Sequence, residues 1–176
     1  RSLAEILQAI VLIGSLVGKQ KEAEVLAANL RARLEELKRV ATQLPRRPRV
    51  YFEEWPDPMI SGIRWVSELV ELVGGDDIFV EKSRGSLAKQ RFVSSQDVID
   101  ANPDVVIASW CGKKVKRQQI LAREGWEDIA AIANERVYEI NSTIILQPGP
   151  AALTAGVDAM AKIIRSVALE EPLDLS

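Results

Sequence analysis

Two glutamates, Glu53 and Glu54, stand next to each other in this sequence, and paired carboxylates are the groups that glycosidases use as acid and base. The run Val50-Tyr51-Phe52 before them predicts a strand, and successive side chains of a strand point to opposite faces of the sheet. The two carboxylates are therefore not expected to act together on one substrate.

The single cysteine, Cys111, is the one thiol nucleophile of the chain, and the 176 residues include no histidine to serve as its base. One cysteine also cannot make an internal disulfide or the ligand cluster of a zinc site. We interpret Cys111 as a small buried residue. The sequence therefore predicts neither histidine-based catalysis nor a metal site.

The residues after the glutamates are suited to binding. Trp55-Pro56-Asp57-Pro58-Met59 follows the predicted strand directly, and the loops at strand ends are where α/β sheets bind ligands. An indole and a thioether offer apolar contact surface there, although Trp55 could fold onto its own loop and Met59 could plug the core. Trp110, at the end of another predicted strand, is a second candidate anchor, with packing against the helix near Trp126 as its alternative.

The first 44 residues have a helical pattern with a break at two glycines. Ser2 and Glu5 predict a capping box for the first helix. A second helix is predicted from Lys19 to Leu44, before Pro45, and would be about 39 Å long, enough to connect two lobes. A coiled-coil arm is the alternative. It would pair through the stripe Leu26, Leu30, Leu34 and Leu37.

From residue 46 onward strands alternate with helices. Such alternation favours right-handed crossovers, and a continuous apolar strand favours a sheet that is covered on both faces. The predicted fold class is α/β, with a mainly parallel sheet of three to four strands, flanked by helices and preceded by a long connecting helix. The predicted strands are 50–52, 78–80, 105–108 and 137–140, and the predicted helices are 61–73, 95–101, 115–124, 126–133 and 150–167.

Composition argues against two classes of function. The net charge is −2 and the basic clusters at 46–49 and 113–117 are short, so nucleic acid is not expected as a partner. The apolar run at 9–13 is far shorter than the roughly 20 residues that cross a bilayer. Because the chain begins at Arg1 without a signal sequence, we expect a fragment or a processed form.

Four landmarks, which together cover nearly the whole chain, resemble the substrate-binding proteins that deliver vitamin B12 and ferric siderophores to ABC importers. The second of them is the most specific. The landmarks are the two-glycine segment Ile13–Gly18 with the long helix after it, the block Tyr51–Gly62 continuing to Phe79, the segment Val93–Ile107 and the segment Val137–Pro150.

In that family two α/β lobes enclose a bulky ligand, a rigid helix connects the lobes, and the protein is a carrier and not an enzyme. The resemblance implies that residues 1–18 end a missing N-terminal lobe, that 19–45 form the connecting helix, and that 46–176 form the C-terminal lobe. It implies an ABC transporter permease and the missing lobe as partners. The expected location is the periplasm or, with a membrane anchor, the cell exterior.

The resemblance gives no cofactor besides the ligand. A corrinoid such as cobalamin is the first expectation for that ligand, and a ferric siderophore or haem is the second. A Rossmann-like enzyme or a scaffold domain stays open as the alternative from another class, on the ground of fold alone.

The resemblance also assigns roles to residues. The family places a tryptophan where this chain has Lys89-Gln90-Arg91-Phe92, a segment that could bind amides or carboxylates or could be a solvated loop. A permease-docking acid of the vitamin B12 member corresponds to Gln96, with Asp97 and Asp100 beside it, although stabilisation of the helix end explains Asp97 equally well. The implied ligand contacts are Trp55, Pro56, Asp57, Met59, Gln90, Trp110, Thr143, Ile145 and Gln147.

Overall fold

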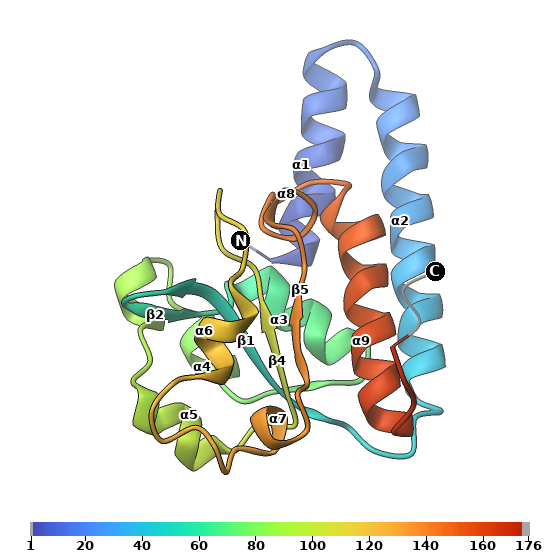
Figure 1. The fold of residues 1–176 in the computed structure, drawn as a ribbon. Coiled ribbons are helices and arrows are strands. Elements are labelled where there is room, and N and C mark those ends of the chain that lie inside the picture. The colour runs from blue at the N-terminus through green and yellow to red at the C-terminus, as the bar shows by residue number, and fades with distance from the viewer. Residues whose placement is uncertain (1, 174–176) are drawn as a thin grey trace.

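The computed structural model describes residues 2–173, which begin with a helical hairpin (Figure 1). Helices α1 (Leu3–Leu16) and α2 (Gln20–Ala41) run antiparallel and side by side. The predicted capping box is confirmed: the Glu5 amide donates to Ser2 Oγ at 3.3 Å, and the Ser2 amide donates to the Glu5 carboxylate at 2.6 Å. Gly18, with a φ of +74°, supplies the left-handed residue at the turn between the helices.

Helix α2 packs three leucines of its stripe on the molecule itself, whereas Leu26 is exposed. Leu30 and Leu34 are buried in the same apolar cluster as residues of α3 (Arg64–Leu72) and α9 (Val157–Leu169). The coiled-coil alternative is wrong for these positions, because their side chains are not available to a second helix. With 22 residues α2 is about 33 Å long, and its role as a connection between lobes stays a prediction.

A mainly parallel sheet forms the centre of the rest, as predicted (Figure 1). Strand β1 (Arg49–Pro56) pairs in parallel with β4 (Val105–Ala108), which pairs in parallel with β5 (Val137–Glu139). The end of β1 pairs antiparallel with β2 (Met59–Ser61), and its start pairs in parallel with β3 (Asp76–Asp77). The sheet has five strands, more than predicted, because β2 and β3 are too short to leave a pattern in the sequence.

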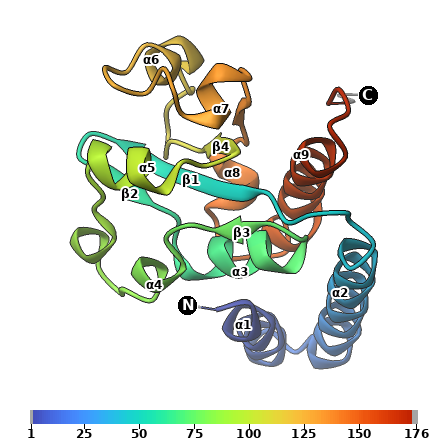
Figure 2. The ribbon, with the colours of Figure 1, turned by 90° about the horizontal axis from the view of Figure 1, so that it is seen from below.

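Helices cover both faces of this sheet, and Figure 2 shows α3 and α9 on one side and α6 and α7 on the other. The alternation along β1 divides the core accordingly: Val50 and Phe52 join the cluster of α3 and α9, whereas Tyr51 joins the opposite cluster. The remaining helices are α4 (Val80–Ser83), a 3-10 turn (Ala88–Arg91), α5 (Ser95–Ala101), α6 (Arg117–Leu121), α7 (Ala130–Ala133), α8 (Ser142–Ile145) and a π-helical turn (Ala152–Gly156).

Four predicted elements differ from the structure. The strand expected at 78–80 is wrong, because Asp77 Oδ1 accepts a hydrogen bond from the Phe79 amide at 3.0 Å and turns the chain there. The helices expected over 115–133 are shorter, since Gly125 takes a φ of +78° between them. The closing helix starts with the π-helical turn, in which a Cβ on Gly156 would come within 2.3 Å of the Ile144 carbonyl oxygen. Within residues 2–173, every helix is too short or too polar to cross a bilayer.

Candidate functional site

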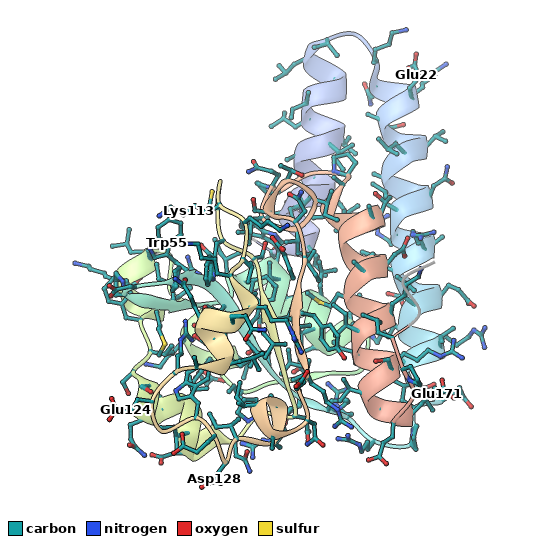
Figure 3. The ribbon with its side chains drawn as sticks, in the orientation of Figure 1. Glu22, Trp55, Lys113, Glu124, Asp128 and Glu171 are labelled. Carbon is teal, nitrogen blue, oxygen red and sulfur yellow. The ribbon has the colours of Figure 1, made fainter. Side chains whose placement is uncertain are left out.

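The loops after three neighbouring parallel strands meet at the carboxyl edge of the sheet. Because β4 lies between β1 and β5, its loop touches the loops on either side. The Lys113 ammonium of the β4 loop lies 4.5 Å from the ring centre of Trp55 on the β1 side (Figure 3). The Gly112 amide donates to Ser142 Oγ on the β5 side at 3.4 Å. The three loops therefore form one continuous edge.

Trp55 stands near the tip of the hairpin formed by β1 and β2, where a loop was predicted. Its side chain is half-buried, and its Nε1 donates to the Asp57 carbonyl at 3.0 Å, so the indole does rest on its own turn. Pro56 pairs with Met59 across the hairpin. Met59 is half-buried against the cluster around Tyr51, whereas Asp57 is exposed. The hairpin thus presents an aromatic face and polar backbone at the edge.

The first glutamate, Glu53, is fully buried and bound on every side. Arg123 donates to its two oxygens at 2.6 and 3.0 Å, Trp110 Nε1 donates at 3.0 Å and the Tyr51 hydroxyl at 3.2 Å. Burial, together with the negative charge of Glu53, raises the pKa of Tyr51 well above its ordinary value, so this hydroxyl remains a donor. Glu53 is a structural group and not a free base.

The second glutamate, Glu54, is bound from the opposite face, as the strand pattern predicted. Arg91 donates to its oxygens at 2.5 and 3.1 Å, and the same guanidinium donates to the Ser61 carbonyl at 2.6 Å. Arg91 itself is 3% exposed. Two arginines thus fix the end of β1 from its two sides, and this end carries Trp55.

Two of the predicted ligand contacts lie in the interior. Trp110 is buried and belongs to the same cluster as Trp126, which matches the packing alternative for this residue. Ile145 is fully buried in the other cluster, and its carbonyl accepts from Trp65 Nε1 at 3.0 Å. In this conformation neither side chain reaches the surface where a ligand would lie, so both support the loops that carry the exposed groups.

The polar candidates fall into two places. Thr143 is exposed, donates from Oγ1 to Asn141 Oδ1 at 2.9 Å and lies at the edge; Gln147 is exposed further along the same loop. Gln90 is exposed but belongs to the 3-10 turn beside β2, where its Oε1 accepts from the Leu87 amide at 2.9 Å. The structure therefore does not bring Gln90 together with the β4 and β5 loops.

A shallow hollow of about 590 Å³ lies between the β4 and β5 loops. Sequence reasoning missed its two lysines, because it treated them as part of a short basic cluster; their position directly after a buried strand was the available signal. Cys111, interpreted as buried, is exposed, because the chain leaves the sheet and turns there. The hollow is lined by Gly112, Lys113, Lys114, Glu139, Asn141, Ser142 and Thr143.

The residues considered for permease docking lie at the surface of α5. Asp97 forms a capping box with Ser94, which is the cap in place of the expected Ser95: the Ser94 amide donates to Asp97 at 2.8 Å, and the Asp97 amide donates to Ser94 Oγ at 3.1 Å. The bond from the Ser94 backbone lowers the pKa of Asp97. Gln96 Nε2 donates to Asp100 Oδ1 at 2.7 Å. Docking by these residues stays a prediction.

Comparison with known proteins agrees with this architecture. A family model described as periplasmic binding protein matches residues 1–143. A vitamin B12-binding protein of Vibrio campbellii is 32% identical over 138 residues, covering 78% of this chain and 48% of that protein. An uncharacterized ABC transporter substrate-binding lipoprotein of Bacillus subtilis is 23% identical over 169 residues, covering 93% of this chain and 51% of that protein.

A solved structure shares the fold. The periplasmic heme-binding protein of Roseiflexus sp. RS-1, in apo form, superposes with a TM-score of 0.78 at 22% identity, over 95% of this chain and 64% of that one. The chain spans about half the length of the curated relatives it matches. Since the family model covers most of its residues, the chain belongs to the periplasmic binding protein family.

Proposed function

We propose that this chain is the C-terminal ligand-binding lobe of the solute-binding protein of an ABC importer, and that it holds a corrinoid against the carboxyl edge of its sheet. The observation that carries the proposal is the continuous edge of three loops with the indole of Trp55 partly open on it. A flat apolar macrocycle gains about 25 cal/mol for each Å² that it buries on such a surface. The similarity to a vitamin B12-binding protein supports the choice of ligand.

A second lobe, N-terminal to this one, completes the site in our proposal. The end of the helical hairpin extends beyond the carboxyl edge of the sheet (Figure 1) and bears an exposed apolar patch. Patches of this kind mark interfaces. Its residues are Leu12, Ile13, Leu16 and Val17, each 60–78% exposed. The single lobe leaves one face of the ligand in water, and we expect it to bind weakly by itself.

Binding is favoured over catalysis, because each of the two adjacent glutamates already accepts hydrogen bonds from an arginine. A haem or a ferric siderophore is the second choice of ligand, and the heme-binding structure of the same fold supports haem. The permease would dock on the α5 surface at Gln96, Asp97 and Asp100, in the periplasm or, with a membrane anchor, at the cell exterior. The lipoprotein relative supports such a location.

The proposal is tested by titrating cyanocobalamin into the full-length protein that contains this chain. We expect saturable binding, and we expect Trp55→Ala to remove about 2 kcal/mol of apolar contact, or roughly 30-fold in Kd. Val40→Ala serves as the matched control, because Val40 is an exposed apolar residue near the C-terminal end of α2, and it should bind like wild type.

The contrary outcomes are distinct. Absence of both heat and spectral change with cyanocobalamin rules out the corrinoid, and the same titration with hemin or a ferric siderophore then tests the second choice. Unchanged affinity of the Trp55→Ala variant for a ligand that does bind would place the ligand away from this edge.

A further inference from the structure

The side chain of Lys113 lies over one face of the Trp55 indole, and this contact is too weak to hold the ring in place. The ammonium lies 4.5 Å from the ring centre, although Lys113 is exposed and the neighbouring lysine, Lys114, is exposed as well. A cation over an indole at an exposed site gains little, about two- to fivefold in an equilibrium constant. The contact can therefore be broken by a ligand that competes for the indole.

Charge in the hollow is unbalanced. Among residues 2–173, neither Lys113 nor Lys114 takes part in an ion pair, whereas Arg91 and Arg123 at the end of β1 do. The one acid of the hollow, Glu139, accepts a hydrogen bond from the Val115 amide at 3.0 Å and is held at the base of the loop. Lys113, over the indole, and Lys114, at the hollow, are thus two exposed ammonium groups without an ion-pair partner among these residues.

The access of ligand to Trp55 depends on this cover. The Nε1 edge of the indole is fixed by its hydrogen bond to the Asp57 carbonyl, so the ring keeps its place when a ligand arrives. A flat ligand that stacks on the face occupied by Lys113 must displace the ammonium. The displaced ammonium stays tethered beside the rim of the ligand, where a negative group gives it a stronger partner than the indole did.

We propose that Lys113 is a displaceable cover of Trp55, and that the site selects a flat ligand with an anionic rim substituent, a carboxylate or a phosphate, which Lys113 and Lys114 bind after the cover has moved. This inference rests on the proposed function and deepens it, because it names the chemistry of the ligand rim. It assigns the two lysines to selectivity and Trp55 to general affinity.

The matched probes are two dicyano-corrinoids that share one ring: dicyanocobyrinic acid, with carboxylates at its rim, and dicyanocobinamide, with amides. The test uses the full-length protein with Lys113→Met, which keeps the apolar stem and removes the charge. We expect the carboxylate probe to bind about three- to tenfold more weakly to this variant. We expect the amide probe to bind equally well or up to about fivefold more tightly, because the ligand no longer has to break a cation–π contact.

Lys116→Met is the control, since Lys116 lies in the same exposed loop but does not line the hollow. It removes the same charge and should leave the ratio of the two affinities unchanged. Equal effects of both substitutions on the carboxylate probe, or no effect of Lys113→Met on the ratio, overturn the inference while the proposed function stands. Failure of both probes to bind the wild-type protein overturns the corrinoid choice of the proposed function and the ligand chemistry together.

A second readout needs no ligand. Trp65, Trp110 and Trp126 are at most 4% exposed, so Trp55 dominates collisional quenching of the four tryptophans of this chain. Here the variant is Lys113→Ala, which removes the stem together with the ammonium. Once the unfolding transition shows that each variant is folded, we expect acrylamide to quench Lys113→Ala more strongly than wild type. Lys116→Ala should match wild type. Equal quenching of wild type and Lys113→Ala would show that Lys113 does not cover the ring, and would overturn the inference whatever the probes do.

Discussion

Trp55, near the end of β1, and Trp110, just after β4, lie at the same edge of one sheet and have opposite environments. Trp110 is 4% exposed and its Nε1 donates to the buried carboxylate of Glu53. Trp55 is half-buried, its Nε1 is bound by a carbonyl of its own turn, and one ring face is covered by a mobile type of side chain, a lysine. The same residue type thus serves as a support in one loop and as an accessible surface in the next.

The difference shows how a rigid edge of the sheet can present a partly exposed aromatic side chain. Glu53 takes hydrogen bonds from Trp110, Arg123 and Tyr51, and these come from three separate segments of the chain. Such a network is stable only when every member is satisfied. The buried tryptophan helps to fix the end of β1, and β1 in turn holds Trp55 in place.

The largest effect is expected when the support itself is broken, with Glu53→Ala. This change leaves Arg123 without its partner in a site where the carboxylate was fully buried, and we expect a loss of about 3–5 kcal/mol in the free energy of unfolding. Denaturation with urea measures it. Glu36→Ala, which breaks the exposed pair with Arg39, is the control and should leave stability unchanged. Similar stabilities for the two variants would show that the buried network does not support the edge.

Replacing each tryptophan by phenylalanine sharpens the comparison directly. Trp110→Phe removes the Nε1 donor to Glu53, and we expect a loss of about 1–3 kcal/mol in unfolding free energy. Trp55→Phe removes a donor to an exposed carbonyl that water can replace, and we expect a change below about 0.5 kcal/mol. In ligand affinity, by contrast, Trp55→Phe should lose more than Trp110→Phe. A larger loss of stability in Trp55→Phe would reverse the roles that we assign to the two residues.

The smallest effect is expected for Asp77, a buried acid beside the start of β1 that forms no ion pair with an arginine of residues 2–173. Burial raises the pKa of Asp77, so the folded protein holds this proton more tightly than the unfolded chain, whose pKa is about 4. Stability from this group is therefore present at low pH and is lost as pH rises from about 4 through the raised pKa.

Asp77→Asn should remove that decline, because an amide does not ionise and its oxygen can still accept from the Phe79 amide. The measurement is the unfolding free energy at pH 4 and pH 7 in both proteins, with Asp76→Asn, the exposed neighbour, as the control. An equal dependence of the unfolding free energy on pH in wild type and Asp77→Asn would mean that burial does not disfavour the ionised carboxylate of Asp77.

Local patterns predicted the parts of this fold that depend on neighbours in sequence. The capping box at Ser2 needs only Glu5, and the strand at 105–108 needs only its own apolar run. The opposite directions of Glu53 and Glu54 follow from the strand period alone. These features were readable because each is settled within a few residues.

Features that join distant residues were not readable from one sequence. Arg123 and Glu53 are 70 positions apart in the sequence, and no periodic pattern predicts that they bind each other. The burial of Trp110 depends on that same network, and the cover on Trp55 depends on a lysine from the loop of the adjacent strand. The exposure of Cys111 likewise follows from where the chain leaves the sheet, which composition does not fix.

The shortness of the outer strands has a consequence for how this edge can change. The sheet places its longer strands, β1 and β4, in the middle and keeps β2, β3 and β5 at three residues or fewer on the outside. On β5, the Val137 carbonyl accepts from Arg117 Nε at 3.0 Å instead of from another strand. The outer strands therefore offer few unpaired backbone groups to a strand of another molecule, which disfavours edge-to-edge association. Loop sequences at this edge can therefore vary without adding a long strand edge that is open to such pairing.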